Sequence, residues 1–232
     1  MVRYDEVTVN GRPMQVLVAE AGTGGPHPGI LLMEHIGGFD DFTEDYAARL
    51  AGEGYSVVSP DVFHVVPPGT EKSKKRSFMT DTQVEQDALA ALAHLKTLPN
   101  VDASRLGTIG HCMGGRMSMQ AALVTDELKV VVDLYGGHMF LSWGDEPKTP
   151  FERLDRFSGD FLGLFGAEDK NPSPDDVKKI VARLDELGID TTVHFFEGAG
   201  HAFQNFVEPE RYREKQSVEA WNITLAYLKE RL

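Results

Sequence analysis

Residues 107–115 read Gly107-Thr108-Ile109-Gly110-His111-Cys112-Met113-Gly114-Gly115, and this stretch decides how the chain is interpreted. The apolar run Leu106–Ile109 predicts a strand, and the segment Gly115–Leu123 predicts a helix. Between them, a Gly-x-Cys-x-Gly turn places Cys112 on a sharp bend, where neighbouring glycines allow close approach of the backbone. The pattern is typical of a nucleophile elbow with cysteine in place of the usual serine.

The position of Cys112 ahead of a helix has chemical consequences. The first N–H groups of a helix lack intrahelical acceptors and carry partial positive charge, which favours a thiolate and an oxyanion. A lone cysteine is more often a small buried hydrophobic side chain. We therefore interpret Cys112 as a nucleophile only if a base, and a residue that orients the base, follow in the chain.

Outside the elbow, strands and helices alternate along the chain. Two runs around Asn10-Gly11 predict an N-terminal antiparallel edge pair, Tyr4–Val9 with Met14–Ala19. From Gly29 onward, the alternation predicts an α/β fold: a mainly parallel sheet with helices on both faces, in a single domain over residues 1–232. Further strands are expected at Gly29–Met33, Tyr55–Ser59, Lys129–Tyr135, Asp160–Phe165 and Thr191–Phe196. Further helices are expected at Asp41–Glu53, Asp81–Leu98, Ser173 or Pro174 to Leu187, and Arg211–Leu232.

Composition limits the partners of this chain. It has 232 residues, 41% of them hydrophobic, and a formal net charge of −13, which argues against nucleic acid or an anionic membrane. The single cysteine excludes an internal disulfide and a cysteine-cluster metal site. His35, His64 and His111 do not form a recognised metal-ligand spacing. We expect no metal and no cofactor.

The start of the chain carries no apolar segment of the kind found in secretion signals, and no run of residues approaches membrane-spanning length. We therefore expect a cytoplasmic protein in a reducing compartment, where a free thiol persists. A monomer or a small homo-oligomer is expected.

Four functional side chains each follow a different predicted strand: Glu34, Cys112, Asp169 and His201. In open parallel sheets the active site lies beyond the carboxyl ends of the strands. The order of nucleophile, acid and histidine along the chain is that of a catalytic triad. Cys112 would attack a carbonyl carbon as a thiolate, His201 would take and return the proton, and Asp169 would orient the imidazole.

Two loops are expected to complete the site. The N–H of Met113, with an N–H from the Glu34–Ile36 loop, at His35, would bind the oxyanion of a tetrahedral intermediate. The segment Val62–Thr80 is predicted to be irregular and contains several basic residues, among them Arg76. Such a run is usually a solvated loop, but its position after a strand makes it a possible lip over the site.

The chain resembles the dienelactone hydrolase family of α/β-hydrolases. The resemblance extends over nearly the whole chain, and its most specific part is the cysteine elbow with an upstream glutamate. The matching pieces are Glu34-His35-Ile36-Gly37, Gly110-His111-Cys112-Met113-Gly114-Gly115, Tyr135-Gly136, Gly166-Ala167-Glu168-Asp169 and Gly198-Ala199-Gly200-His201-Ala202-Phe203. The family implies a Cys–His–Asp triad that opens an enol-lactone by acyl transfer to water. In it, Glu34 would match a glutamate that interacts with the thiol and helps to ionise it.

The resemblance also implies substrate-binding positions, and one of them departs from the family pattern. Family members that hydrolyse dienelactone carry an arginine four residues after the histidine, where this chain has Asn205. Arg76 is the candidate for a second substrate arginine, and Tyr135 is a further candidate for substrate contact. Without the first arginine, we expect a preference for neutral esters or lactones over anionic ones.

The same sequence features are compatible with other functions. A general carboxylesterase or thioesterase would use the same triad. A non-catalytic ligand-binding relative would typically lack a triad member, and here all three are present. A thiol redox protein would need a resolving cysteine, which this chain lacks.

Overall fold

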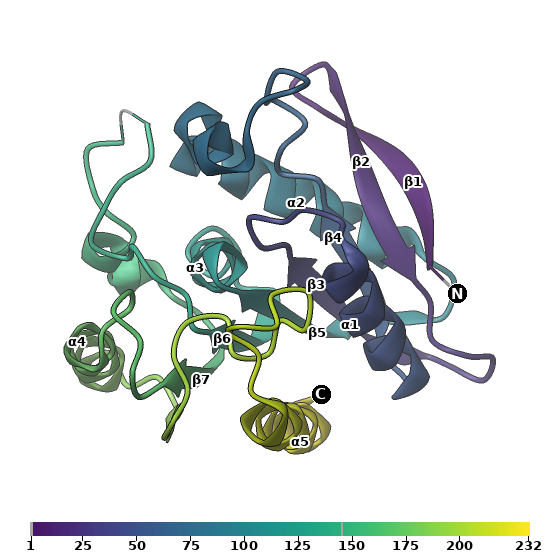
Figure 1. The fold of residues 1–232 in the computed structure, drawn as a ribbon. Helices are drawn as coiled ribbons and strands as arrows, with labels where there is room; N and C mark the ends of the chain where they lie inside the picture. Colours follow the sequence, from purple (N-terminus) through teal and green to yellow (C-terminus); the bar gives the residue numbers. More distant parts are fainter. Residues whose placement is uncertain (1, 145) are drawn as a thin grey trace.

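The computed structural model describes residues 2–144 and 146–232, and its strands form one eight-stranded sheet. The strand order is β1-β2-β4-β3-β5-β6-β7-β8 (Figure 1). The strands are β1 (Val2–Val9), β2 (Arg12–Ala19), β3 (His27–Met33), β4 (Ser56–Pro60), β5 (Val101–His111), β6 (Leu128–Leu134), β7 (Asp160–Gly166) and β8 (Thr191–Phe196).

The pairing of the strands confirms the predicted mainly parallel sheet with an antiparallel edge pair. β1 and β2 pair antiparallel and are joined at Asn10 and Gly11, both of which have positive φ angles, 50° and 76°. β2 also pairs antiparallel with β4, whereas every pairing from β4 through β8 is parallel. The carboxyl ends of the parallel strands therefore meet at one edge of the sheet, where the candidate residues follow them.

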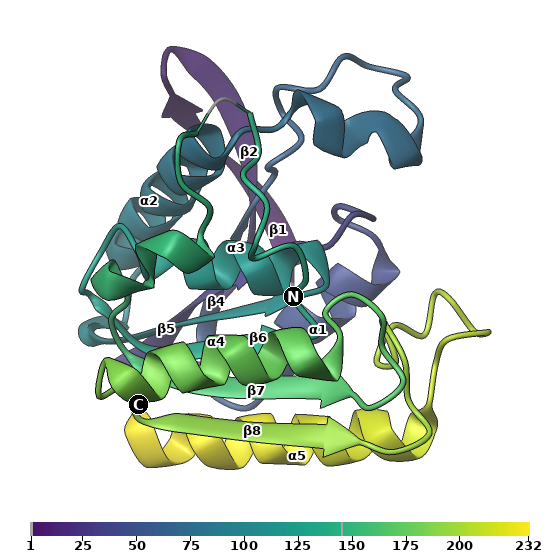
Figure 2. The same ribbon diagram turned by 90° about the vertical axis from the view of Figure 1, so that its left-hand side faces the viewer.

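Helices cover both faces of the sheet, as the alternation of elements predicts. α1 and α5 share one face, where Tyr46 of α1 contacts Trp221 of α5, and α2 and α3 lie on the opposite face (Figures 1 and 2). α4 packs against β8 and a short 3₁₀ helix, η2. The helices are α1 (Asp41–Gly52), α2 (Asp81–Thr97), α3 (Met113–Ala121), α4 (Pro174–Glu186) and α5 (Glu214–Arg231), with 3₁₀ helices η1 (Lys72–Phe78) and η2 (Phe151–Arg156).

The central strands are apolar in a continuous run because both of their sides are covered. In β3, Ile30 and Leu32 belong to the core under α1 and α5, whereas Leu31 and Met33 belong to the core under α2 and α3. All four side chains are buried. A parallel strand between two helix layers has no solvent-facing side, which explains why the alternation seen in β1 is absent here.

Three helices begin at a capping side chain, and the elbow helix does not. Asp40, Thr80 and Ser173 each accept a hydrogen bond from the backbone N–H three residues ahead, at the start of α1, α2 and α4. The residue at the corresponding position of α3 is Cys112, whose side chain makes no capping hydrogen bond. The thiol is thereby left to contact other groups.

Several predicted boundaries were wrong. The elbow helix begins at Met113, two residues earlier than predicted, and the segment Val62–Thr80 contains η1. The last helix begins at Glu214 instead of Arg211, because the N–H of Arg213 donates to the carbonyl of Phe203 and turns the chain back before the helix starts. Within the described residues, no helix has both the length and the apolar character needed to cross a membrane.

Candidate active site

Cys112 lies between β5 and α3 in a backbone conformation that is unusual for a residue with a side chain. Its φ is 57° and its ψ is −120°. The N–H of Cys112 donates to the carbonyl of Leu134 at 2.9 Å, and its own carbonyl accepts from Gly115 at 3.0 Å. Such positive-φ residues cost free energy and persist only where the surrounding structure holds them. Here the hydrogen bonds on both sides hold the bend that lifts the thiol above the sheet.

Two of the motif's glycines are required by close backbone contact. A Cβ at Gly110 would collide with the carbonyl of Gly114, and a Cβ at Gly114 would collide with the carbonyl of Met33 at the end of β3. Any larger residue would push the turn away from the sheet. The spacing Gly-x-Cys-x-Gly thus follows from the packing of the bend itself, as expected of an elbow.

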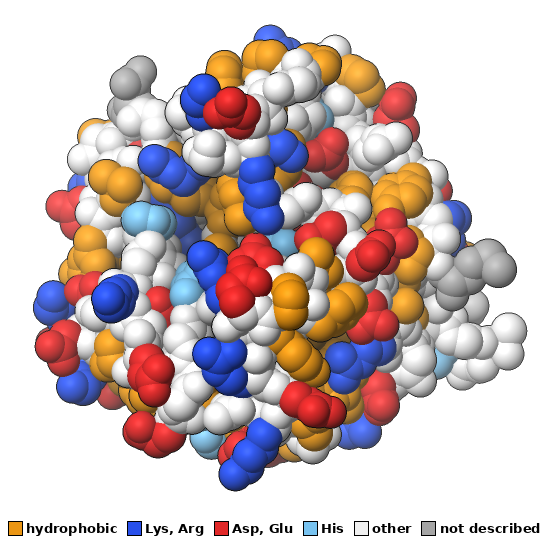
Figure 3. All heavy atoms as spheres, viewed as in Figure 1, with side chains coloured by type: hydrophobic (Ala, Val, Ile, Leu, Met, Phe, Trp, Pro, Cys, Tyr) orange, Lys and Arg blue, Asp and Glu red, His pale blue; other side chains and the backbone are white. Residues whose placement is uncertain are grey.

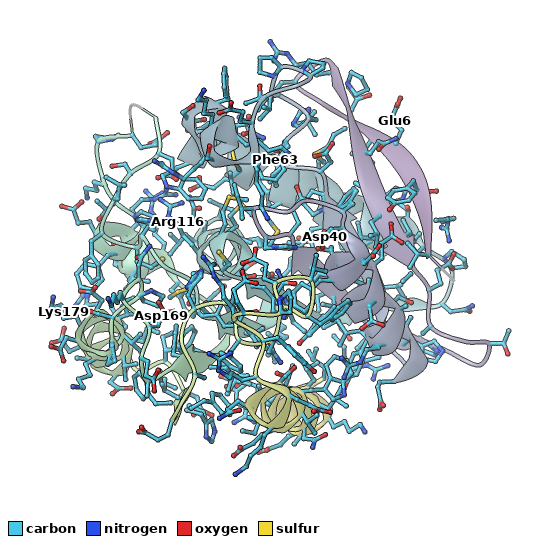
Figure 4. The ribbon with its side chains drawn as sticks, viewed as in Figure 1. Glu6, Asp40, Phe63, Arg116, Asp169 and Lys179 are labelled. Atoms are coloured by element: carbon cyan, nitrogen blue, oxygen red, sulfur yellow. The ribbon has the colours of Figure 1, made fainter. Side chains whose placement is uncertain are left out.

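The sulfur, an imidazole and a carboxylate form a continuous chain of contacts. Cys112 Sγ lies 2.9 Å from Nε2 of His201, and Nδ1 of His201 lies 2.8 Å from Oδ2 of Asp169. Oδ1 of Asp169 accepts the N–H of Asn171 at 2.9 Å, which fixes the carboxylate just beyond β7 (Figure 4). The three residues predicted from the sequence to act together are therefore in hydrogen-bonding contact.

The environment of His201 favours its protonated form. Burial by itself would lower the pKa of this imidazole, but the hydrogen bonds to Asp169 and Cys112, with their negative charges, raise it to about 10. At neutral pH the ring then carries a positive charge. A charge of this sign, 2.9 Å from the sulfur, stabilises a thiolate.

Glu34 is buried beside the site but does not contact the thiol in this structure. Its Oε1 accepts the N–H of Val62 at 3.0 Å, and its Oε2 has no hydrogen-bond partner. Burial raises the pKa of this carboxyl well above its ordinary value, and the nearby charge of Asp61 adds to the effect. The expected interaction with Cys112 is therefore not present, because the carboxyl turns to the loop after β4.

The two predicted oxyanion-binding positions border the thiol. Met113 is the first residue of α3, so its N–H has no intrahelical acceptor. The ring of His35 is turned away, with Nε2 2.9 Å from Oδ1 of Asp40, and only its backbone is available for this role. Ile36, the next residue, lines the cavities on both sides of Cys112.

A cavity of about 210 Å³ opens beside Cys112 and His201. Arg76 of η1 lines it, so the loop predicted as a possible lip does border the site. Its guanidinium lies 5.9 Å from the ring centre of Trp143, which lines the same cavity. Figure 3 shows this face of the molecule, with apolar side chains at the base of a hollow and Lys, Arg and His side chains around it.

A smaller cavity lies on the other side of Cys112 and contains the two remaining candidates. Tyr135 and Asn205 both line it and both are buried. The ring of Tyr135 packs edge-on against His201, with 5.5 Å between ring centres. The amide oxygen of Asn205 accepts the N–H of Val207 at 3.0 Å.

Sequence reasoning missed a cation in this smaller cavity. Arg211 lines it, in ion-pair contact with Glu208 at 3.1 Å. Arg211 was expected at the start of the last helix, whereas it belongs to the loop before α5. His138, Asn171 and Trp143 of the larger cavity were also missed; the only signal was that their loops follow strand ends. Among the described residues, no three His, Cys, Asp or Glu side chains come together in a way that could hold a metal ion.

Comparison with known proteins places the chain in a family. The sequence profile of the dienelactone hydrolase family matches residues 14–232. A Bradyrhizobium protein named "Probable 2-oxo-3-(5-oxofuran-2-ylidene)propanoate lactonase" is 28% identical over 97% of this chain and 92% of its own length. A Synechocystis protein named "Putative carboxymethylenebutenolidase" is 25% identical over 93% of this chain and 92% of its own.

Solved structures agree on the fold. The crystal structure of the dienelactone hydrolase-like promiscuous phosphotriesterase P91, from metagenomic libraries, superposes with a TM-score of 0.85. It covers 99% of this chain and 98% of its own at 21% identity, a level that supports the fold alone. Together with the profile match, these similarities show that the chain belongs to the dienelactone hydrolase family and is an α/β-hydrolase of the lactone or ester class.

Proposed function

We propose that this protein hydrolyses its substrate with a Cys112–His201–Asp169 triad, through a thioester acyl-enzyme. The observation that carries the proposal is the unbroken chain of contacts, 2.9 Å from sulfur to imidazole and 2.8 Å from imidazole to carboxylate. A nucleophile, a base and a residue that orients the base are the three parts that covalent acyl transfer needs.

In the first half of the reaction, the thiolate of Cys112 attacks the carbonyl carbon and forms a carbon–sulfur bond. The carbonyl electron pair moves to oxygen, and the resulting oxyanion accepts hydrogen bonds from the N–H of Met113 and an N–H at residues 35–36. When this intermediate collapses, the carbon–oxygen bond of the ester breaks. The departing oxygen takes the proton from His201. In a lactone, the resulting hydroxyl group remains part of the acyl chain, because breaking this bond opens the ring.

In the second half, water replaces the leaving group. Neutral His201 takes a proton from water, whose oxygen attacks the thioester carbon. The second tetrahedral intermediate collapses with loss of the sulfur, which regenerates the thiolate beside a protonated His201. Asp169 stabilises the imidazolium that forms in each half and keeps the ring oriented.

The substrate is an ester or lactone small enough to reach Cys112 through the cavity of about 210 Å³. Arg76 is the one arginine among the described residues that line this cavity, and we assign it to contact with a carboxylate or another polar group of the substrate away from the reacting carbonyl. Arg211 lines the smaller cavity, but its charge is compensated by Glu208. A general carboxylesterase would use the same residues on esters of other shapes, and a thioesterase would use them on a substrate whose leaving atom is sulfur.

The presence of only one cysteine makes a chemical test of the nucleophile specific. Iodoacetamide should abolish the hydrolysis of p-nitrophenyl acetate in proportion to the alkylation of Cys112, and a slowly hydrolysed ester should protect against it. The Cys112→Ala variant, treated in the same way, controls for alkylation elsewhere. Full turnover after complete alkylation would overturn the proposal. An absence of turnover with all activated esters would favour a ligand-binding protein.

A further inference from the structure

A third cavity adjoins the cavity of about 210 Å³ beside Cys112 and His201. Its volume is about 370 Å³, and it lies between the loop Gly137–Trp143 and helix α4. Gly137, His138 and Asn171 line both cavities, so the two cavities adjoin at these residues. A molecule bound at Cys112 and longer than the first cavity would therefore extend into this groove.

The loop that forms one wall of the groove is held from inside the protein. Arg116 of α3 is fully buried and donates to the carbonyl of His138 at 3.1 Å and to that of Leu141 at 2.7 Å. Its guanidinium also pairs with the buried carboxylate of Asp81 at 2.8 Å and stacks on Trp143, 3.8 Å from the ring centre. A wall fixed in this way offers a preformed surface to a ligand.

The side chains on the outer side of this loop are apolar and exposed. Phe140 and Leu141 remain 40% and 47% accessible, although they are large hydrophobic residues. Phe140 rests on Phe151 of η2, with 4.5 Å between the ring centres. Two exposed apolar side chains on an anchored loop, directly beside a catalytic cavity, are typical of a surface that binds a substrate.

The charges around the groove compensate one another. Lys179 of α4 lies at the edge of the molecule (Figure 4), with its ammonium 3.2 Å from Asp176 and 5.5 Å from the ring centre of Phe140. Where the two cavities meet, the amide of Asn171 lies 2.7 Å from Nε2 of His138. Burial lowers the pKa of His138, which keeps that ring neutral. No net charge is therefore offered to an ionic group.

We propose that this groove is a second subsite, which binds an uncharged apolar arm of several carbons on the ester substrate. The inference rests on the proposed function and goes beyond it, since it predicts selectivity for the length of the substrate. The arm belongs to either the acyl or the alcohol side of the ester, because both have the same apolar chemistry. The experiment distinguishes the two sides.

The test compares chain-length selectivity in matched variants. Leu141→Ser should lower the ratio of kcat/KM for p-nitrophenyl hexanoate to that for p-nitrophenyl acetate about fivefold, which corresponds to about 1 kcal/mol. A parallel series, hexyl acetate against methyl acetate, probes the alcohol side. The control is Leu89→Ser, because Leu89 on α2 is 39% accessible and lines neither cavity; it should leave both ratios unchanged.

Each result bears on the inference. A fall in the acyl series alone assigns the groove to the acyl arm, and a fall in the alcohol series alone assigns it to the alcohol arm. Unchanged ratios in both series for Leu141→Ser, or an equal fall for Leu89→Ser, would overturn the subsite. Ester hydrolysis that persists in Cys112→Ala would instead overturn the proposed function, so the two failures are distinguishable.

Discussion

His201 joins the nucleophile to the carboxylate, and its protonation state decides when the site can act. With a pKa of about 10, the imidazolium is available to protonate a leaving group until the pH approaches that value. An alkyl alcohol needs this proton, whereas p-nitrophenolate leaves without it. The two kinds of ester should therefore differ in their response to alkaline pH.

We predict that kcat/KM for an alkyl acetate falls as the pH rises through about 10, while kcat/KM for p-nitrophenyl acetate does not fall there. The measurement is a pair of pH–rate profiles between pH 7 and pH 10.5 or so, with circular dichroism to confirm that the protein stays folded. An alkaline fall near pH 7 for the alkyl ester would show that His201 holds its proton far less strongly than its contacts imply.

Glu34 differs from His201 in that burial is the main cause of its shifted pKa. Its folded-state pKa is raised, so the folded protein binds a proton that the unfolded chain releases above about pH 4.3. Between the unfolded and folded pKa values, the free energy of unfolding of the wild type therefore falls as the pH rises. A neutral side chain of the same shape should remove this dependence.

We predict that Glu34→Gln becomes more stable relative to the wild type as the pH rises above about 4.3, by up to about 1.4 kcal/mol per pH unit. Glutamine keeps the oxygen that accepts the N–H of Val62. Urea unfolding at several pH values measures the difference, with Glu6→Gln on the exposed side of β1 as the control. Equal pH dependence of wild type and Glu34→Gln would mean that the carboxyl is not desolvated.

Substitution of Asn205 tests whether the site prefers a neutral or an anionic substrate. Asparagine offers neutral hydrogen bonds, each worth about 1 kcal/mol, where a family arginine would offer a permanently charged clamp whose charge-assisted bonds are worth about 1.5–3 kcal/mol. Asn205→Arg should raise the ratio of kcat/KM for a carboxylated ester over its methyl ester by about tenfold, mainly through KM.

Arg76→Gln should lower the same ratio of kcat/KM, that of the carboxylated ester over its methyl ester. If Arg76→Gln left the ratio unchanged, Arg76 would not contact the carboxylate, and the preference for neutral substrates predicted from Asn205 would gain support.

Among the elements, α3 is anchored to its surroundings by a buried charge. Arg116, on this helix, and Asp81, at the start of α2, form a salt bridge with both side chains fully buried. Removal of one partner leaves an uncompensated buried charge. The same guanidinium holds the loop that follows β6, so α2, α3 and that loop are fixed relative to one another.

We predict that Arg116→Met lowers the free energy of unfolding by about 3–5 kcal/mol. The matched control is Lys178→Met, which breaks an ion pair with Asp175 in which both side chains are exposed, and it should change stability by less than about 1 kcal/mol. Denaturant unfolding of both variants gives the comparison. Arg116→Met no more destabilising than Lys178→Met would contradict the anchoring role.

Elements with a strong local pattern were predictable from the sequence. The apolar run of β3 predicted a buried strand of the sheet, and the turn at Asn10-Gly11 predicted its antiparallel edge. Both patterns depend on neighbouring residues only. Arg211 was misplaced because its helix is delayed by a long-range hydrogen bond between Arg213 and Phe203. No local sequence pattern predicts such a long-range contact.

Across the molecule as a whole, the site also combines features that the sequence pattern predicts with features that depend on contacts between distant residues. Cys112, Asp169 and His201 were predictable as a group because they follow the carboxyl ends of strands that the fold brings to one edge. The groove and its anchoring by Arg116 were not, since they depend on side chains far apart in the chain. The direction of Glu34 was likewise beyond the sequence, because the N–H of Val62 that attracts it belongs to another loop.

Cys112 and His201 are proposed to act as one catalytic unit. Cys112→Ala and His201→Ala should each lower kcat/KM for p-nitrophenyl acetate by at least about a thousandfold, and the double variant should be no slower than the slower single variant. Asp169→Asn should lower it less. Circular dichroism spectra like that of the wild type would show that each variant is folded. Near-normal hydrolysis by folded Cys112→Ala would contradict the account.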